Sequence, residues 1–188
     1  MITIAAIFFE FICFFGFIWS SFFFFKKSSE KNIYIFLIKA IGTLLIFTNI
    51  YFTWTKTNSN TAHDLIGVFF LVISSILFYW SIYTNRKRPL NFAFTEIEKI
   101  TLISNGPYKY IRHPFYSSYI FAWVGSIVIN QNIWLIIPSV IIIFFYYKSA
   151  TTEEFGFLEG PIKTEYQRYM LLTGRFFPKI TPLFKPNN

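Results

Sequence analysis

The stretch that organises this sequence is Gly106-Pro-Tyr-Lys-Tyr-Ile-Arg-His-Pro-Phe-Tyr116, a polar, conformationally restricted segment between long apolar runs. Its opening Gly-Pro pair predicts a turn. Pro114 has a fixed φ and no amide proton, so it suits the first turn of the apolar helix that follows. His113, directly before that proline, is pushed towards extended geometry. We therefore expect Arg112 and His113 to lie on a rigid corner at a helix N-terminus, where N–H groups without helical partners collect.

The composition is that of an integral membrane protein. The chain of 188 residues is 54% hydrophobic and only 14% charged, and several apolar runs are long enough to cross a bilayer. The formal charge of +8 lies mostly between those runs, as orientation signals do, so we expect no nucleic-acid partner. The single cysteine, Cys13, excludes an intramolecular disulfide and is expected to be a buried packing thiol. No Cys/His cluster has metal-ligand spacing, so no metal site is expected.

We expect an all-α integral membrane protein with about five transmembrane helices and a cytoplasmic C-terminal helical segment. The expected spans are residues 2–25, 33–54, 65–83, 114–129 and 133–147. The last two form a hairpin around Asn130-Gln131-Asn132, and each arm is short, reaching roughly 24 Å against about 30 Å of hydrocarbon. Since the polar turn should reach water, the end that lies below the headgroups is expected to be the one carrying His113.

The basic residues predict an orientation. Lys and Arg crowd the first and third connections and the tail, which places the N-terminus outside and the C-terminus in the cytoplasm. Glu10 lies inside the first run, where an ionisable group is a functional candidate, but its position near the chain end favours the headgroup interface. Lys39 is near enough to the start of its span to extend outwards. The segment that follows Arg86-Lys87-Arg88-Pro89 and runs to Ile103 is expected to form an interfacial helix or loop, and residues 163–172 a short helix.

Two polar groups are expected to meet on one face, because a hairpin returns the chain to the side from which it started. These groups are Tyr108, Tyr110, Arg112, His113 and Tyr116 before the hairpin, and Glu153 and Glu154 after it. Aromatic faces, an imidazole and carboxylates suit a ligand that is cationic at one end and anionic at another. The alternative is a membrane-boundary loop whose basic residues fix topology, with both glutamates solvated and paired to Lys148 or Arg112.

The C-terminal part resembles the isoprenylcysteine carboxyl methyltransferase family. The motifs that carry the resemblance are residues 106–116, Glu153-Glu154, Glu165-Tyr166-Gln-Arg-Tyr169 and Arg175-Phe-Phe-Pro178. The wider group of membrane methyltransferases includes phospholipid N-methyltransferases. The resemblance covers about residues 102–178, whereas the first three spans are similar to the family only in being apolar.

The resemblance implies a helical membrane enzyme that binds S-adenosylmethionine in a cytoplasmic pocket closed by the C-terminal segment. Lipophilic or prenylated acceptors would reach this pocket from the surrounding membrane lipids. It implies a single domain over residues 1–188, with three N-terminal spans in 1–84 and the cofactor-binding portion in 100–178. The short connections suggest a prokaryotic inner membrane, and the oligomeric state is open.

Site residues carry over by position. Those that would line the cofactor pocket are Leu102, Ile103, Tyr108, His113, Pro114, Phe115 and Tyr116. A glutamate of the pair would hold the amino group of the cofactor, and Glu153 and Glu154 both remain candidates. Counting back from Tyr166 favours Glu154, although Glu-Glu-Phe-Gly-Phe-Leu158 is one residue longer than the usual Glu-Glu-x-x-Leu.

The expected catalytic group consists of Arg112, His113, Glu154 and Arg175. A carboxylate acceptor needs no base, whereas an amine or thiol must lose a proton, for which His113 or a glutamate is the candidate. Arg112 or Arg175 would anchor an anionic group of the cofactor or of the acceptor.

Two departures from the family leave the acceptor open between a prenylcysteine-type carboxylate and another lipid-like small molecule. Ser149-Ala150 stand near where the eukaryotic carboxyl methyltransferases have a substrate-binding Arg, and Ile162-Lys163 replace the usual Phe-Gly. The closest alternative function is an NADPH-dependent membrane sterol or lipid reductase, which shares a His-Pro-x-Tyr corner. Reductases typically carry an Arg-Asp-Glu cluster and a later Cys, which this sequence lacks. A non-enzymatic membrane subunit is the remaining alternative.

Overall fold

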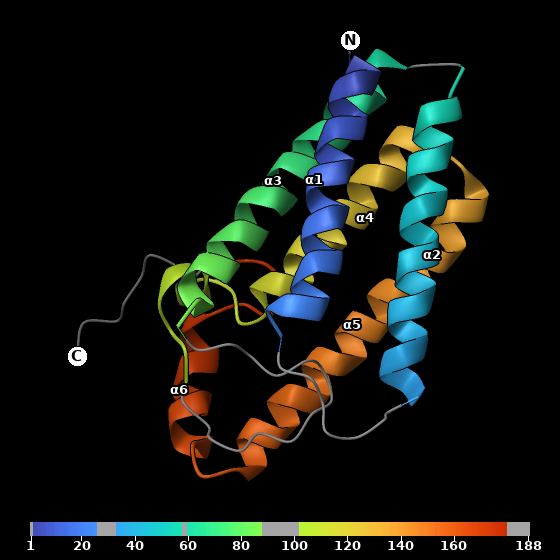
Figure 1. Cartoon of the computed structure of the whole chain (residues 1–188). Helices are drawn as coiled ribbons and strands as arrows, with labels where there is room; N and C mark the ends of the chain where they lie inside the picture. Colours follow the sequence, from blue (N-terminus) through green and yellow to red (C-terminus); the bar gives the residue numbers. More distant parts are fainter. Residues whose placement is uncertain (1, 26–32, 58–59, 88–101, 180–188) are drawn as a thin grey trace.

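The computed structural model describes residues 2–25, 33–57, 60–87 and 102–179, and within these ranges the chain is helical (Figure 1). The elements are α1 (Ile2–Phe23), α2 (Ile33–Thr55), α3 (Thr61–Asn85), the 3-10 turn η1 (Gly106–Lys109), α4 (Pro114–Asn130), α5 (Ile133–Glu159) and α6 (Lys163–Leu172). These described ranges contain no β-strand, only an isolated parallel bridge between Ile111 and Gly174. The expected all-α class is confirmed. The interfacial segment expected before Ile103 lies largely outside the described residues.

Among the helices of the described residues, α1, α3 and α5 are long and apolar enough to cross a membrane. Both ends of α3 extend beyond the apolar run of 65–83. The helix begins at Thr61 because Asn60 caps it, its side chain accepting hydrogen bonds from the amides of Ala62 and His63. His63, which lies between the expected spans 33–54 and 65–83, is therefore a helical residue.

The second arm of the hairpin is not short. Helix α5 runs for 27 residues from Ile133 to Glu159, well past the end of the apolar run at Tyr147. Pro138 lies within this helix, and after Tyr147 no further proline occurs until Gly160-Pro161, so the backbone continues although the side chains turn polar. The acidic pair therefore lies on α5 itself, which extends past the ends of α1 and α4 towards α6 (Figure 1). We inferred that the His113 end of the hairpin lies below the headgroups because both arms were expected to be short. Since α5 is long, that reason no longer holds.

Helices α3 and α4 cross at a pair of glycines. A Cβ atom added to Gly67 would lie 2.7 Å from the carbonyl oxygen of Gly125, and one added to Gly125 would lie 2.8 Å from that of Gly67. The two backbones therefore meet without intervening side chains, as is common between membrane helices. This contact fixes the course of α4, whose first turn carries the corner.

Polar side chains inside the bundle join α1 to its neighbours. Cys13 is buried and free, as expected, and its thiol lies 3.3 Å from the carbonyl oxygen of Leu71. Glu10 does not lie at the surface of the bundle: its side chain is fully buried. It accepts a hydrogen bond of 2.9 Å from Ser126 on α4. Glu10 was expected at the interface because of its place in the sequence, but α1 turns this face towards the bundle.

Candidate functional site

The corner, which comprises residues 106–116, has a backbone that requires glycine at its first position. Gly106 has a φ of +58°, and a Cβ there would collide with the hydroxyl of Thr84 at the end of α3. Two residues on, Tyr108 is buried, and its hydroxyl accepts a hydrogen bond of 3.0 Å from Asn85. Its carbonyl oxygen accepts a 2.6 Å bond from the Tyr169 hydroxyl. Burial raises the pKa of Tyr169 to about 12, so this hydroxyl stays protonated and donates at neutral pH.

The segment after α6 runs alongside the corner and pairs with its backbone. The amide of Arg112 donates to Gly174 O at 2.8 Å, and the amide of Gly174 donates to Tyr110 O at 3.1 Å. The amide of His113 donates to Arg175 O at 3.1 Å. The N–H of His113 is therefore already paired by the protein and is not available to a ligand. The pairing locks the C-terminal segment against the start of α4.

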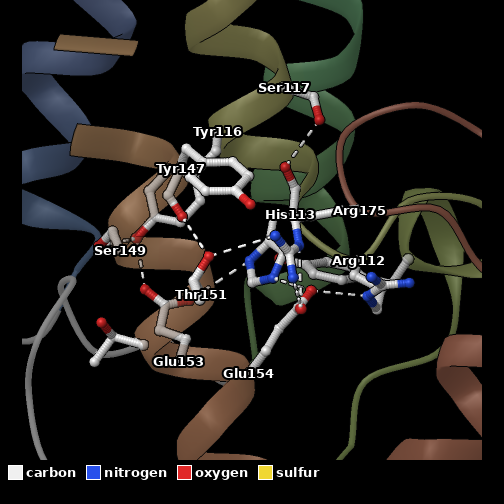
Figure 2. Close-up of polar contacts among 12 residues, drawn as sticks. Arg112, His113, Tyr116, Ser117, Tyr147, Ser149, Thr151, Glu153, Glu154 and Arg175 are labelled. Carbon is white, nitrogen blue, oxygen red and sulfur yellow. Dashed lines mark hydrogen bonds and ion pairs between the residues drawn. The ribbon is translucent and has the colours of Figure 1, made fainter. Parts of the chain in front are cut away.

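Glu154 lies at the centre of a buried charge cluster, as Figure 2 shows. Its Oε1 atom accepts from Arg112 Nε at 2.9 Å and lies 3.1 Å from His113 Nε2. Its Oε2 atom accepts from Arg175 Nη2 at 2.6 Å and Arg175 Nε at 3.1 Å. Both carboxylate oxygens are therefore engaged by charged or polar groups of the chain itself. The carboxylate of Glu154 in turn raises the pKa of Arg175.

Glu153 has a different environment, although it is the next residue along α5. Its Oε1 accepts a 2.5 Å hydrogen bond from the Tyr116 hydroxyl, and its Oε2 lies 3.6 Å from His113 Nδ1. Its side chain is 30% exposed, against 3% for Glu154. The imidazole of His113 thus lies between the two glutamates, with one ring nitrogen near each (Figure 2).

A cavity of about 280 Å³ opens beside this cluster. The expected site residues that line it are Leu102, Ile103, Tyr108, Arg112, His113, Pro114, Phe115, Tyr116 and Glu153. Glu154 and Arg175 are not among the lining residues. The structure thus brings the predicted residues together, but it separates those that face the cavity from those that hold the corner in place.

Part of the cavity wall comes from helices that sequence reasoning did not connect with the site. Residues of α1, α2, α5 and α6 contribute to it, among them Phe22, Lys39, Gly42, Phe145, Tyr146 and Tyr166. Lys39 was expected to extend outwards to the headgroups, but it lines the cavity and donates to the carbonyl of Ser21 at 3.3 Å. In the sequence, the one sign that α2 contributes to the cavity was Lys39 itself, a cation within an apolar run.

A sequence profile of the phospholipid methyltransferase family matches residues 63–160, which is 98 of the 188 residues. The chain belongs to this phospholipid methyltransferase family. The family falls within the group of membrane methyltransferases similar to isoprenylcysteine carboxyl methyltransferase, so the expected resemblance is confirmed. Comparison with curated proteins and with solved structures gives no match.

Membership identifies the protein as a membrane methyltransferase, a class that acts on lipid-like substrates. The matched region of this methyltransferase runs from α3 through the corner and α4 to the end of α5. It contains both His113 and the acidic pair, whereas α6 and Arg175 follow it. The part of the chain in which the cavity meets the charge cluster is thus largely the part that the family shares.

Proposed function

We propose that this methyltransferase transfers the methyl group of S-adenosylmethionine to a lipid-like acceptor bound in the cavity beside His113. The observation that carries the proposal is the cavity itself, with Glu153 in its wall and a fixed imidazole beside that carboxylate. The family supplies the reaction class, and the chemistry of the lining residues supports the cofactor.

The lining residues fit S-adenosylmethionine, which carries an ammonium group, a sulfonium, a carboxylate and a planar purine. The carboxylate of Glu153 is a suitable partner for an ammonium group. The rings of Tyr108, Tyr166 and Tyr169 also line the cavity and offer faces for a cation or for a purine. The cavity volume of about 280 Å³ is near the lower end of small-molecule sites, which is roughly 300 Å³.

We assign the contact with the ammonium group of the cofactor to Glu153. The count back from Tyr166 in the sequence favoured Glu154 instead. Glu153 lines the cavity and is partly exposed, whereas both oxygens of Glu154 are bound by Arg112, His113 and Arg175. Removing Glu154 from that cluster to bind a ligand would leave buried positive groups without their partner, which is costly. Glu154 therefore positions the corner, and Glu153 meets the ligand.

The two arginines also separate into different roles. Arg112 lines the cavity and remains the candidate anchor for the carboxylate of the cofactor. Arg175 lies outside the lining residues and bonds to Glu154. Its role is to fasten the C-terminal segment against the corner.

The cofactor supplies an electrophilic methyl group on a sulfonium sulfur. In the transfer the sulfur–methyl bond breaks, a bond to the acceptor atom forms, and the sulfur leaves as a neutral thioether. For a carboxylate acceptor the protein needs only to align the two reactants and exclude water. For an amine acceptor a proton must also leave. His113 Nδ1, which lies on the side of Glu153, is the nearest candidate to receive it.

We further propose that residues 1–188 form one domain with five spans, α1 to α5, in a prokaryotic inner membrane. Helix α2 has 23 residues and α4 has 17, and both are predominantly apolar. The basic residues of the first and third connections and of the tail support an outside N-terminus. With that orientation the cavity, α6 and the C-terminal segment lie on the cytoplasmic side, where the cofactor is available.

Ligand-induced thermal stabilisation of the detergent-solubilised protein tests the cofactor. We expect S-adenosylmethionine and its demethylated product to raise the melting temperature, and NADPH to leave it unchanged. Stabilisation by NADPH alone would indicate a reductase, and stabilisation by neither would contradict the proposal. Radiolabelled methyl incorporation into lipid and prenylpeptide fractions then identifies the acceptor class.

A further inference from the structure

The cavity has an apolar wall that the cofactor contacts proposed above do not use. It is formed by α1 and α2, which contribute Phe17, Ile18, Phe22, Gly42, Thr43 and Ile46. The charged and phenolic groups assigned to the cofactor come instead from the corner, α5 and α6. An apolar wall between membrane helices suits a hydrocarbon chain, since burial of apolar surface is its main source of affinity.

One cation lies within this wall. Lys39, in the second turn of α2, lines the cavity and donates to the carbonyl of Ser21. Its ammonium nitrogen lies 5.9 Å from the centroid of the Phe22 ring. A charged side chain at such a position in a membrane helix is costly to keep and therefore suggests a function. The long, flexible stem of lysine allows the ammonium to move onto a ligand anion.

The other charges of the cavity lie on different elements. The guanidinium of Arg112 bonds to Glu154 and to the carbonyl of Thr173. Glu153 faces Tyr116 and His113. Positive charge on α2 and negative charge on α5 thus mark two subsites in one cavity, of which the second suits the ammonium of the cofactor.

We propose that Lys39 binds an anionic group of the methyl acceptor, and that the apolar wall around Gly42 holds the acceptor's chain. The acceptor is then a lipid with a phosphate or carboxylate group close to the atom that receives the methyl group. This inference rests on the proposed function, because it names the acceptor of that same site and the residue that selects it.

Substitutions of Gly42 test the binding of the acceptor's hydrocarbon chain separately from the charge of Lys39. A Cβ atom at this position would lie 3.4 Å from Ile142 Cδ1, which is an ordinary van der Waals contact. Gly42→Ala therefore fits without displacing its neighbour and gains helix propensity. Because Gly42 lines the cavity, the larger side chain of Gly42→Leu occupies volume that the acceptor needs.

The experiment measures equilibrium binding of defined lipids to detergent-solubilised protein saturated with S-adenosylhomocysteine, so that binding is read without turnover. The probes are phosphatidylethanolamine for the phosphate, farnesylcysteine for the carboxylate, and farnesol as a chain without an anion. We expect Lys39→Met to weaken binding of one anionic probe by about tenfold or more, the usual cost of a lost charged hydrogen bond. Farnesol binding should stay within about twofold, and Lys39→Arg should restore most of the affinity.

Lys148→Met is the matched control, because Lys148 is exposed on α5 and is not among the lining residues. It should bind every probe as the unmodified protein does. Gly42→Leu should lose all three probes while its affinity for S-adenosylhomocysteine stays within about threefold, and Gly42→Ala, which adds only one methyl group, should weaken lipid binding far less than Gly42→Leu does.

The outcomes separate this inference from the proposed function. Failure of S-adenosylhomocysteine to bind the unmodified protein would overturn both. Two results would overturn only the role of Lys39, provided that the cofactor product binds normally. One is an unchanged affinity of Lys39→Met for the lipid probes, and the other is that neither anionic probe binds the unmodified protein. The anionic probe that loses affinity shows whether the group is a phosphate or a carboxylate.

Discussion

The two ends of the helical bundle both contain buried charges but arrange them differently. At the end with the corner, Glu153 borders a cavity, and its neighbour Glu154 holds the elements that form it. At the other end, where α3 begins and α4 ends, Lys56 donates to Asp64 and to the carbonyl of Ile129, both at 2.6 Å. There the paired charges connect helices to one another. A buried charge in this protein is therefore not by itself evidence of a site; its position relative to the largely apolar cavity beside His113 separates the two cases, because the hollow that Lys56 lines at the other end has mostly polar residues around it.

Glu154 and Asp64 provide the strongest test of this contrast. Glu154→Gln and Asp64→Asn each remove a buried negative charge and leave its cationic partner, so we expect each to cost about 3–5 kcal/mol of stability. Only Glu154→Gln should lower methyl transfer per folded molecule, because it releases Arg175 and the corner. Thermal unfolding in detergent, combined with activity normalised to folded protein, checks this. Normal specific activity in Glu154→Gln would show that the cluster is structural alone.

Glu153→Gln should leave stability nearly unchanged and lower the affinity for the cofactor. The amide oxygen can still accept the hydrogen bond from Tyr116, so stability without ligand should change by less than about 1 kcal/mol. Loss of the charge removes a contact worth about 1.5–3 kcal/mol to an ammonium group, and cofactor affinity should fall about 10-fold to 100-fold. Calorimetric titration with S-adenosylhomocysteine measures this. An unchanged dissociation constant would exclude Glu153 as the ammonium partner.

The difference between these neighbours explains what the sequence predicted and what it did not. The corner follows from local rules, because Pro114 and His113 restrict their own backbone wherever the chain goes. That the acidic pair returns to the corner followed from the hairpin. Which glutamate faces the cavity did not follow, since adjacent helical residues point about 100° apart. The rotation of α5 depends on its packing against α2, α4 and α6.

Two other features of the fold were also beyond sequence reasoning. The apolar run ends at Tyr147 while α5 continues to Glu159, because side-chain polarity marks the burial of a helix and not its end. The α1 and α2 wall of the cavity was missed because a Phe that faces lipid and a Phe that faces a cavity are equally apolar. Only Lys39 differed from its surroundings, and its inward position depends on the packing of α1 against α2.

Substitution of two glycines tests how closely α3 and α4 pack, and the expected effect on stability is smaller than for Glu154 or Asp64. Gly67→Ala places a methyl group 2.7 Å from the carbonyl oxygen of Gly125 and should cost about 1–3 kcal/mol through overpacking. Gly156→Ala on α5 is the matched control, since its Cβ would meet no heavy atom of the described residues within 4 Å. It should be neutral or stabilise by up to about 1 kcal/mol. Thermal unfolding of both variants in the same detergent compares them, and equal melting temperatures would contradict the close helix crossing.

The smallest expected effect concerns Glu10, a membrane-buried ionisable group that general experience would assign to function. Its Oε1 accepts from Ser126, and its Oε2 has no hydrogen-bond partner within the part of the chain that the structure describes. Glu10→Gln keeps the oxygen that Ser126 uses, so stability should change by less than about 1 kcal/mol. Turnover and cofactor affinity should match the unmodified protein, because Glu10 is not among the residues that line the cavity. A loss of turnover at unchanged stability would mean that the two ends of the bundle are coupled, and that distance from the cavity is not a sufficient criterion for a structural role.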